Sequence, residues 1–98
     1  MIARVVLLKI KEEALSERTA FAGACLHFLR NLSMVQDVRV GVPADEGSAK
    51  SWDLIIQVFF QDDDKLAEYQ QDEDHRAFVE NEILPRAAVR KAWNFALL

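Results

Sequence analysis

Apolar side chains occupy both alternating faces of the segment Trp52–Gln61. Ile55 and Phe59 lie on one face, where Asp53 and Gln57 are the only polar interruptions. The opposite face carries Trp52, Leu54, Ile56, Val58 and Phe60. Because successive side chains of a strand point to opposite faces, this pattern predicts a β-strand that is covered on both sides.

A second strand with two apolar faces is predicted at the start of the chain, over Ile2–Lys11. Arg4 is its conspicuous polar residue. Shorter apolar alternations predict two more strands, over Val35–Val42 and Val89–Leu98. The apolar side of the last strand carries Val89, Trp93, Phe95 and Leu97, interrupted by Lys91.

The first helix is predicted to begin with Ser16 as its N-cap and to run to about Leu32, with apolar residues at helical spacing. Gly23 lies within it and costs roughly 1 kcal/mol relative to alanine unless something packs closely there. The single cysteine, Cys25, cannot form an internal disulfide and is predicted to be a small buried hydrophobic residue rather than a nucleophile. His27 is predicted to be solvated.

The second helical region is predicted to be broken. The acidic run Asp62–Asp64 is interpreted as a helix start rather than a metal site, because the helix dipole favours negative charge in the first turn. Asp72 is a second candidate N-cap, which predicts a break near Gln71 and a new helix through Leu84. Pro85 then ends that helix or kinks it.

The predicted order of elements is β-α-β-β-α-β, so the fold class is α+β, a ferredoxin-like four-stranded antiparallel sheet. Two helices can cover only one face of the sheet, and a bare apolar face marks an association surface. We therefore expect a homodimer in which two sheets pack face to face as a dimeric α+β barrel. The polar segment Pro43–Ser51 is expected to be the longest and least ordered loop.

Composition narrows the choice of function. The 98 residues predict one domain over 1–98, and 51% hydrophobic residues argue against disorder. A net charge of −4 without a basic cluster disfavours binding to nucleic acid or to an anionic membrane. The chain has no apolar run near the ~20 residues that span a bilayer. Charged residues follow the first apolar run where a signal peptide would have small ones, so a cytoplasmic location is expected.

Two segments carry a resemblance to a known family. The start, MIARVVLLKIKEEA, resembles the opening of the stress-responsive A/B barrel (Dabb) domain. The segment WDLIIQVFFQDDDKLAEYQQDEDHRAFVENEILP resembles that family's YDL strand and its LxxYQxHPxHxxFV helix motif. The resemblance covers nearly the whole chain and implies a homodimeric ferredoxin-like barrel, in agreement with the pattern of elements.

The resemblance also implies candidate site residues. In a plant polyketide cyclase of this family, a tyrosine and a histidine on the broken helix and a histidine on the first strand line the substrate pocket. These positions correspond to Tyr69, His75 and Arg4 here, so the strand position departs from the family pattern. His75 would act as a general base, and Tyr69 would donate a hydrogen bond to a developing enolate. Arg4 cannot act as a base, but it would bind a carboxylate or an enolate.

Each candidate also has a plain structural interpretation. Tyr69 and His75 are then packing or surface residues, and Arg4 pairs with an acidic residue such as Asp53. Trp52 and Trp93 are the remaining candidates for ligand binding, with core or dimer contacts as the alternative. The chain shows no metal-ligand spacing, no phosphate-binding loop and no Ser-His-Asp arrangement, so no cofactor is expected.

Three functions fit these residues. The first is a stress-related Dabb protein that binds a small, partly apolar anionic ligand between the sheet and the broken helix. The second is a cyclase, isomerase or lyase that acts on a small carbonyl compound through His75 and Tyr69. The third is a cofactor-free monooxygenase of the same fold.

Overall fold

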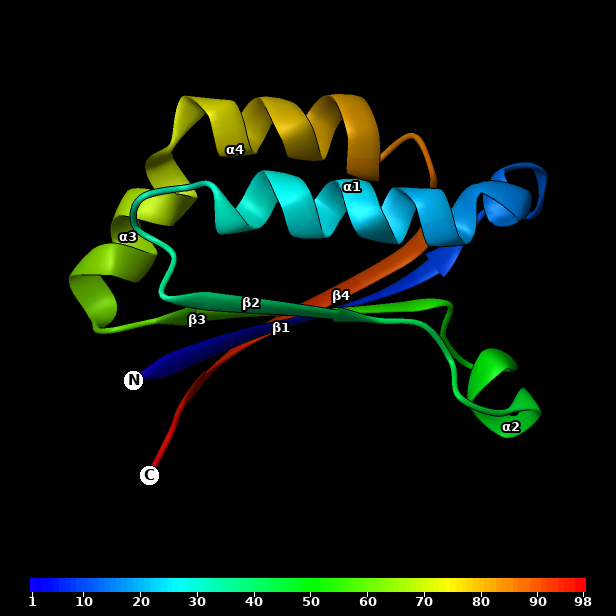
Figure 1. Cartoon of the computed structure of the whole chain (residues 1–98), viewed down its shortest axis with the longest axis horizontal. Coiled ribbons are helices and arrows are strands. Elements are labelled where there is room, and N and C mark those ends of the chain that lie inside the picture. Colours follow the sequence, from blue (N-terminus) through cyan, green and yellow to red (C-terminus); the bar gives the residue numbers. More distant parts are fainter.

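A four-stranded antiparallel sheet forms one layer of the protein and its helices lie mainly on one side of it, as the computed structural model of residues 1–98 shows (Figure 1). The strand order is β2-β3-β1-β4, which is the predicted ferredoxin-like arrangement. Each strand is close to its predicted position, with ends that differ by two residues at most. The strands are β1 (Ile2–Ile10), β2 (Asp37–Gly41), β3 (Leu54–Phe60) and β4 (Ala87–Ala96).

The first helical region begins earlier than predicted. A 3₁₀-helix, η1, covers Glu12–Glu17, and α1 follows over Arg18–Arg30. Ser16 lies inside η1, so its prediction as the N-cap of a long helix was wrong. The chain enters the helix from a tighter turn, and the residue before α1, Glu17, makes no side-chain capping bond.

The second helical region is broken as predicted. Helix α3 covers Asp63–Gln71, and the Asp62 side chain accepts a hydrogen bond from the Lys65 backbone N–H at 3.0 Å. Helix α4 covers Glu73–Phe78 and continues into a π-helix, η2, over Val79–Ile83. Asp72 caps α4, since its carboxylate accepts the His75 backbone N–H at 2.8 Å.

The segment between β2 and β3 is more regular than a loop. A short helix, α2, covers Glu46–Ala49, and Asp45 caps it by accepting the Ser48 N–H at 2.7 Å. The Lys9 ammonium donates to the Ala49 carbonyl at 3.0 Å, which ties α2 to β1. None of the helices is long and apolar enough to cross a membrane.

The core lies between the sheet and the helices. Even-numbered residues of β1 and β3 point into it, and Leu8, Val58 and Phe60 are fully buried. Cys25 on α1 is also fully buried, and burial raises the pKa of its thiol to about 12. Its prediction as a buried hydrophobic residue is confirmed. Helix α1 contributes Phe21, Cys25 and Leu29 to this core.

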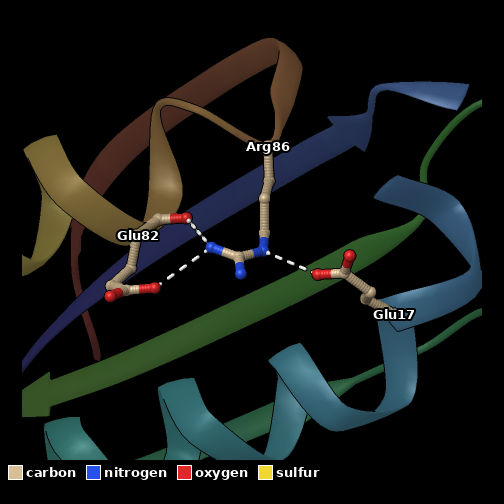
Figure 2. Close-up of polar contacts among 3 residues, drawn as sticks. All are labelled: Glu17, Glu82 and Arg86. Atoms are coloured by element: carbon tan, nitrogen blue, oxygen red, sulfur yellow. Dashed lines mark hydrogen bonds and ion pairs between the residues drawn. The ribbon is translucent and has the colours of Figure 1, made fainter. Parts of the chain in front are cut away.

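Arg86 joins the two helical regions at one end of the molecule (Figure 2). Its Nη1 donates to the Glu82 carboxylate and to the Glu82 carbonyl oxygen, both at 3.0 Å. Its Nε lies 3.4 Å from the Glu17 carboxylate, and its guanidinium lies 5.1 Å from the centre of the Phe21 ring. The end of η2 is thereby fixed against η1 and α1, just before β4 begins.

Helices α1 and α4 leave the other face of the sheet uncovered, and only the short helix α2 lies beside it at one end (Figure 1). The helices α1 and α4 lie above the sheet in Figure 1, while the C-terminal segment extends below it. Trp93 and Phe95 on this face of β4 are 45% and 52% exposed. Val5, Leu7, Ile55 and Phe59 lie on the same face of β1 and β3 and are partly buried. We call these six residues the open face.

Candidate functional site

The break between α3 and α4 brings Tyr69 and His75 together. Their ring centroids lie 3.8 Å apart with an angle of 33° between the ring planes. Six residues of an unbroken helix span roughly 600° of rotation and would place these two rings on different sides. The Asp72 cap redirects the chain between them, so the predicted break is what makes the contact possible.

Tyr69 is held by the core. It is only 3% exposed, and its ring packs 4.9 Å from the ring of Phe60 at the end of β3. Burial raises the pKa of its hydroxyl to about 12, while the charge of Arg4 acts in the opposite direction. The phenol therefore stays protonated near neutral pH and is able to donate a hydrogen bond.

His75 is partly buried and favours its neutral form. Burial is the largest cause that lowers its pKa, and the charge of Arg4 adds to the effect, against the opposing influence of the Tyr69 backbone and the Asp72 carboxylate. Its Nδ1 atom is buried and has no hydrogen-bond partner. A buried polar atom without a partner is unusual and calls for an explanation, such as a bound ligand.

Arg4 lies on the helix-facing side of β1, the side that carries the core residues Val6 and Leu8. It is partly buried, and burial lowers the pKa of its guanidinium. Its Nη1 donates to the Asn94 side-chain oxygen at 2.9 Å, and its charge influences the pKa of both Tyr69 and His75. The chain offers Arg4 no carboxylate within ion-pair distance; the ion pairs involve other residues. We call Arg4, Tyr69, His75 and Asn94 the Arg4 cluster.

The alternative pairing of Arg4 with Asp53 was wrong. Asp53 precedes β3 and is buried, and its carboxylate accepts the Ile10 backbone N–H at 2.8 Å. It also lies 3.6 Å from the Lys9 ammonium and 3.8 Å from the Arg18 guanidinium. The strand register explains the error, since Arg4 is opposite Val58, near the other end of β3.

Asn94 is a member of the cluster that the sequence did not reveal. The sequence pattern placed Trp93 and Phe95 on the apolar side of β4 and indicated no role for the residues on its opposite side. The register places Asn94 directly opposite Arg4 on the neighbouring strand. The alternation along β4 indicates that Asn94 lies on the side opposite to Trp93 and Phe95. The sequence alone does not show which residue of β1 pairs with it.

Neither tryptophan belongs to the Arg4 cluster. Trp93 lies opposite Val5 on the open face, on the other side of the sheet from Arg4. Trp52 precedes β3 and lines a cavity of about 530 Å³ beside α2. That cavity is also lined by Leu7, Gly41, Val42, Pro43, Ala44, Ser48, Ser51, Leu54 and Ile55.

A further cavity of about 550 Å³ lies between α1 and α4. His27 lies at its edge and is exposed, as predicted. The Phe28 and Phe78 rings, stacked 4.2 Å apart, also line it. No member of the Arg4 cluster lines either of these two cavities.

The chemistry of the Arg4 cluster is that of anion recognition. It combines one unpaired cation, one protonated phenol and one neutral imidazole with a free ring nitrogen. An arginine binds a carboxylate through two parallel hydrogen bonds, and partial burial strengthens the attraction. A neutral imidazole is also the form that accepts a proton, so the same groups would serve in proton transfer.

Comparison with solved structures identifies the same fold in other proteins. A Dabb family protein of Mesorhizobium loti with a ferredoxin-like fold is 18% identical, with a TM-score of 0.81, over 99% of this chain and 96% of that chain. A dimeric ferredoxin-like protein of unknown function from Thermobifida fusca is 23% identical, with a TM-score of 0.81, over 98% of this chain and 90% of that chain. A protein of Arabidopsis thaliana is 12% identical, with a TM-score of 0.84, over 100% and 96% of the two chains.

At these low sequence identities, the similarities to solved structures show the fold alone. A comparison with family models is more specific. No curated protein matches the chain. Residues 2–96 match the family model described as the stress responsive A/B barrel domain, Dabb, which covers nearly the whole chain. The protein therefore belongs to the stress-responsive A/B barrel (Dabb) family.

Proposed function

We propose that this Dabb protein is a homodimer that binds a small, partly apolar anion at the Arg4 cluster. The observation that carries the proposal is the partly buried Arg4, which has no carboxylate partner. Its charge influences the pKa of the buried Tyr69 and of His75, whose Nδ1 atom has no hydrogen-bond partner. Burial of an unpaired cation costs free energy, and a bound anion would recover that cost.

Each member of the Arg4 cluster has a task in this proposal. Arg4 binds the negative charge, and Asn94 holds the guanidinium in position through the 2.9 Å hydrogen bond. The Tyr69 hydroxyl donates a second hydrogen bond to the anion. Neutral His75 accepts a hydrogen bond from a hydroxyl or amide of the ligand, which would satisfy Nδ1.

The open face supports the proposed dimer. Trp93 and Phe95 are large apolar side chains that remain about half exposed in a single chain. Aromatic residues of this kind dominate the energetics of protein interfaces. A solved ferredoxin-like neighbour from Thermobifida fusca is described as dimeric, which agrees with self-association of this fold.

Neither catalytic alternative is proposed. The family match assigns no activity, and solved structures at these identities show the fold alone. A cyclase-like enzyme would depend on His75 as a base, whereas a binding protein would retain part of its affinity when His75 is replaced. The His75→Ala variant therefore separates catalysis from binding once a ligand is known.

Titration with benzoate, a small apolar anion, tests the proposal by isothermal calorimetry. Arg4→Gln should lose the binding because the guanidinium provides the charge that attracts the carboxylate. Lys50→Gln is the matched control, since it removes one positive charge from an exposed position beside α2. Equal affinities of Arg4→Gln and the parent protein would refute the proposed site. Native mass spectrometry of the gently purified protein measures the dimer and any retained ligand in the same sample.

A further inference from the structure

Arg90 is a second arginine on the helix-facing side of the sheet. The β1–β4 register places Arg90 opposite Leu8, Ala92 opposite Val6 and Asn94 opposite Arg4. Alternate residues of a strand share a face, so Arg90 and Asn94 lie on the side of the sheet that carries Arg4 and the core. Arg90 is exposed and, like Arg4, takes part in none of the ion pairs of the chain.

Arg4 and Arg90 extend from the same side of two neighbouring strands, β1 and β4. The hydrogen bond from Arg4 to Asn94 draws the Arg4 guanidinium from β1 towards β4, the strand of Arg90. Ala92 is the only residue between Asn94 and Arg90 on this side of β4. Its methyl group is too small to separate two long arginine side chains.

The influence of Arg90 extends over the whole cluster. Burial is the largest influence on the pKa of Arg4, Tyr69 and His75, lowering it for Arg4 and His75 and raising it for Tyr69. The positive charge of Arg90 acts to lower the pKa of all three groups. Two like charges near one another without a counter-charge repel in the free protein. An anion placed between them would remove this repulsion and gain two attractions at once.

We infer that Arg4 and Arg90 together form a two-cation subsite that selects a ligand whose charged end is a dianion, as in a phosphate monoester. The inference rests on the proposed function and specifies the ligand class of the same site. A phosphate monoester has three oxygen acceptors and near neutral pH carries a charge of about −1.5 to −2. Arg4, Arg90 and the Tyr69 hydroxyl supply donors for these oxygens. A monocarboxylate would neutralise only one of the two arginines.

Two probes with the same apolar ring test this selectivity. Phenyl phosphate and benzoate are titrated into the protein by calorimetry at pH 8, where phenyl phosphate is a dianion and His75 is neutral. Phenyl phosphate should bind the parent protein about tenfold more tightly, the value expected for one further charge-assisted hydrogen bond. Arg90→Gln should reduce the affinity for phenyl phosphate to about that for benzoate and leave benzoate nearly unchanged.

The other outcomes separate the two proposals. Loss of both probes in Arg4→Gln, with unchanged binding in Lys50→Gln, supports the site itself. Similar affinities for both probes in the parent protein, or an unchanged preference in Arg90→Gln, would overturn the two-cation subsite while the proposed anion site stands. Benzoate binding that survives Arg4→Gln would overturn both, as would the failure of both probes to bind the parent protein at millimolar concentration.

Discussion

Leu8 and Leu7 are neighbours in β1, yet they occupy opposite faces of the sheet. Leu8 is fully buried beneath the helices, whereas Leu7 lies on the open face and lines the cavity beside α2. The same contrast holds along β3, where alternate residues are buried on the helix side and partly exposed on the other. Two largely apolar faces of one sheet therefore differ in what covers them.

The difference concerns polar groups as well as apolar ones. The covered face includes the Arg4 cluster, in which Tyr69 is buried and Arg4 is partly buried. On the open face, Arg39 lies 5.8 Å from the centre of the Phe59 ring, so a cation there rests on an aromatic surface. The covered face thus provides partly buried polar chemistry, and the open face provides area for association.

The largest expected effect comes from removing the Leu8 side chain. Leu8→Ala should lower the free energy of unfolding by about 3 kcal/mol, because it leaves a cavity in the core. Leu7→Ala is the matched change on the other face and should cost under about 1 kcal/mol in the single chain. Urea unfolding at low protein concentration measures both, and similar losses would show that the two faces are equally covered.

A smaller effect should appear in self-association. Trp93→Ala should weaken the proposed homodimer by about 2 kcal/mol, the cost of removing a large aromatic residue from the centre of an interface, where we expect Trp93 to lie. Leu84→Ala is the control, because Leu84 is 47% exposed, close to the 45% of Trp93, but follows η2 instead of lying on the open face. Sedimentation at several concentrations measures the dissociation constant. An unchanged dissociation constant for the Trp93→Ala variant would show that the interface does not lie on the open face.

The covered face should also respond to pH through His75. Burial and the charge of Arg4 lower its pKa from 6.5, so the unfolded chain binds more protons than the folded one below about pH 6.5. The free energy of unfolding should therefore fall as the pH drops below about 6.5. Above that pH, His75 is neutral in both the folded and the unfolded chain and causes no loss of stability. His75→Gln should reduce this dependence, and His27→Gln, which removes an exposed histidine, is the control. Urea unfolding at pH 7.5 and pH 5.5 measures the difference.

The sequence predicted most of the fold because its signals are local. Alternation gave the strands, and Asp62 and Asp72 marked the starts of the two parts of the broken helix, as their capping bonds confirm. The first helix was predicted less well. Ser16 has a good capping side chain, but the chain begins that region in a 3₁₀-helix whose last residue, Glu17, contacts the distant Arg86.

The Arg4 cluster could be predicted only in part. The resemblance to the Dabb motifs indicated Tyr69, His75 and Arg4. The structure places the Tyr69 and His75 rings in contact, and the charge of Arg4 influences the pKa of both. Asn94 and Arg90 depend on the register between β1 and β4, which joins residues some ninety positions apart. Trp52 and Trp93 were grouped with Arg4 from residue type alone, but strand geometry separates them from it.

The smallest expected effect lies on the outer surface of α1, away from both faces of the sheet. A Cβ atom added at Gly23 would meet nothing within 4 Å, so no close packing requires a glycine there. Gly23→Ala should raise the free energy of unfolding by about 0.5–1 kcal/mol, because alanine favours the helix and restricts the unfolded chain. Gly41→Ala is the contrasting change, since a Cβ there would lie 3.1 Å from Ile55 Cγ2. The added methyl group would press on the open face, so thermal unfolding should show a gain for Gly23→Ala and none for Gly41→Ala.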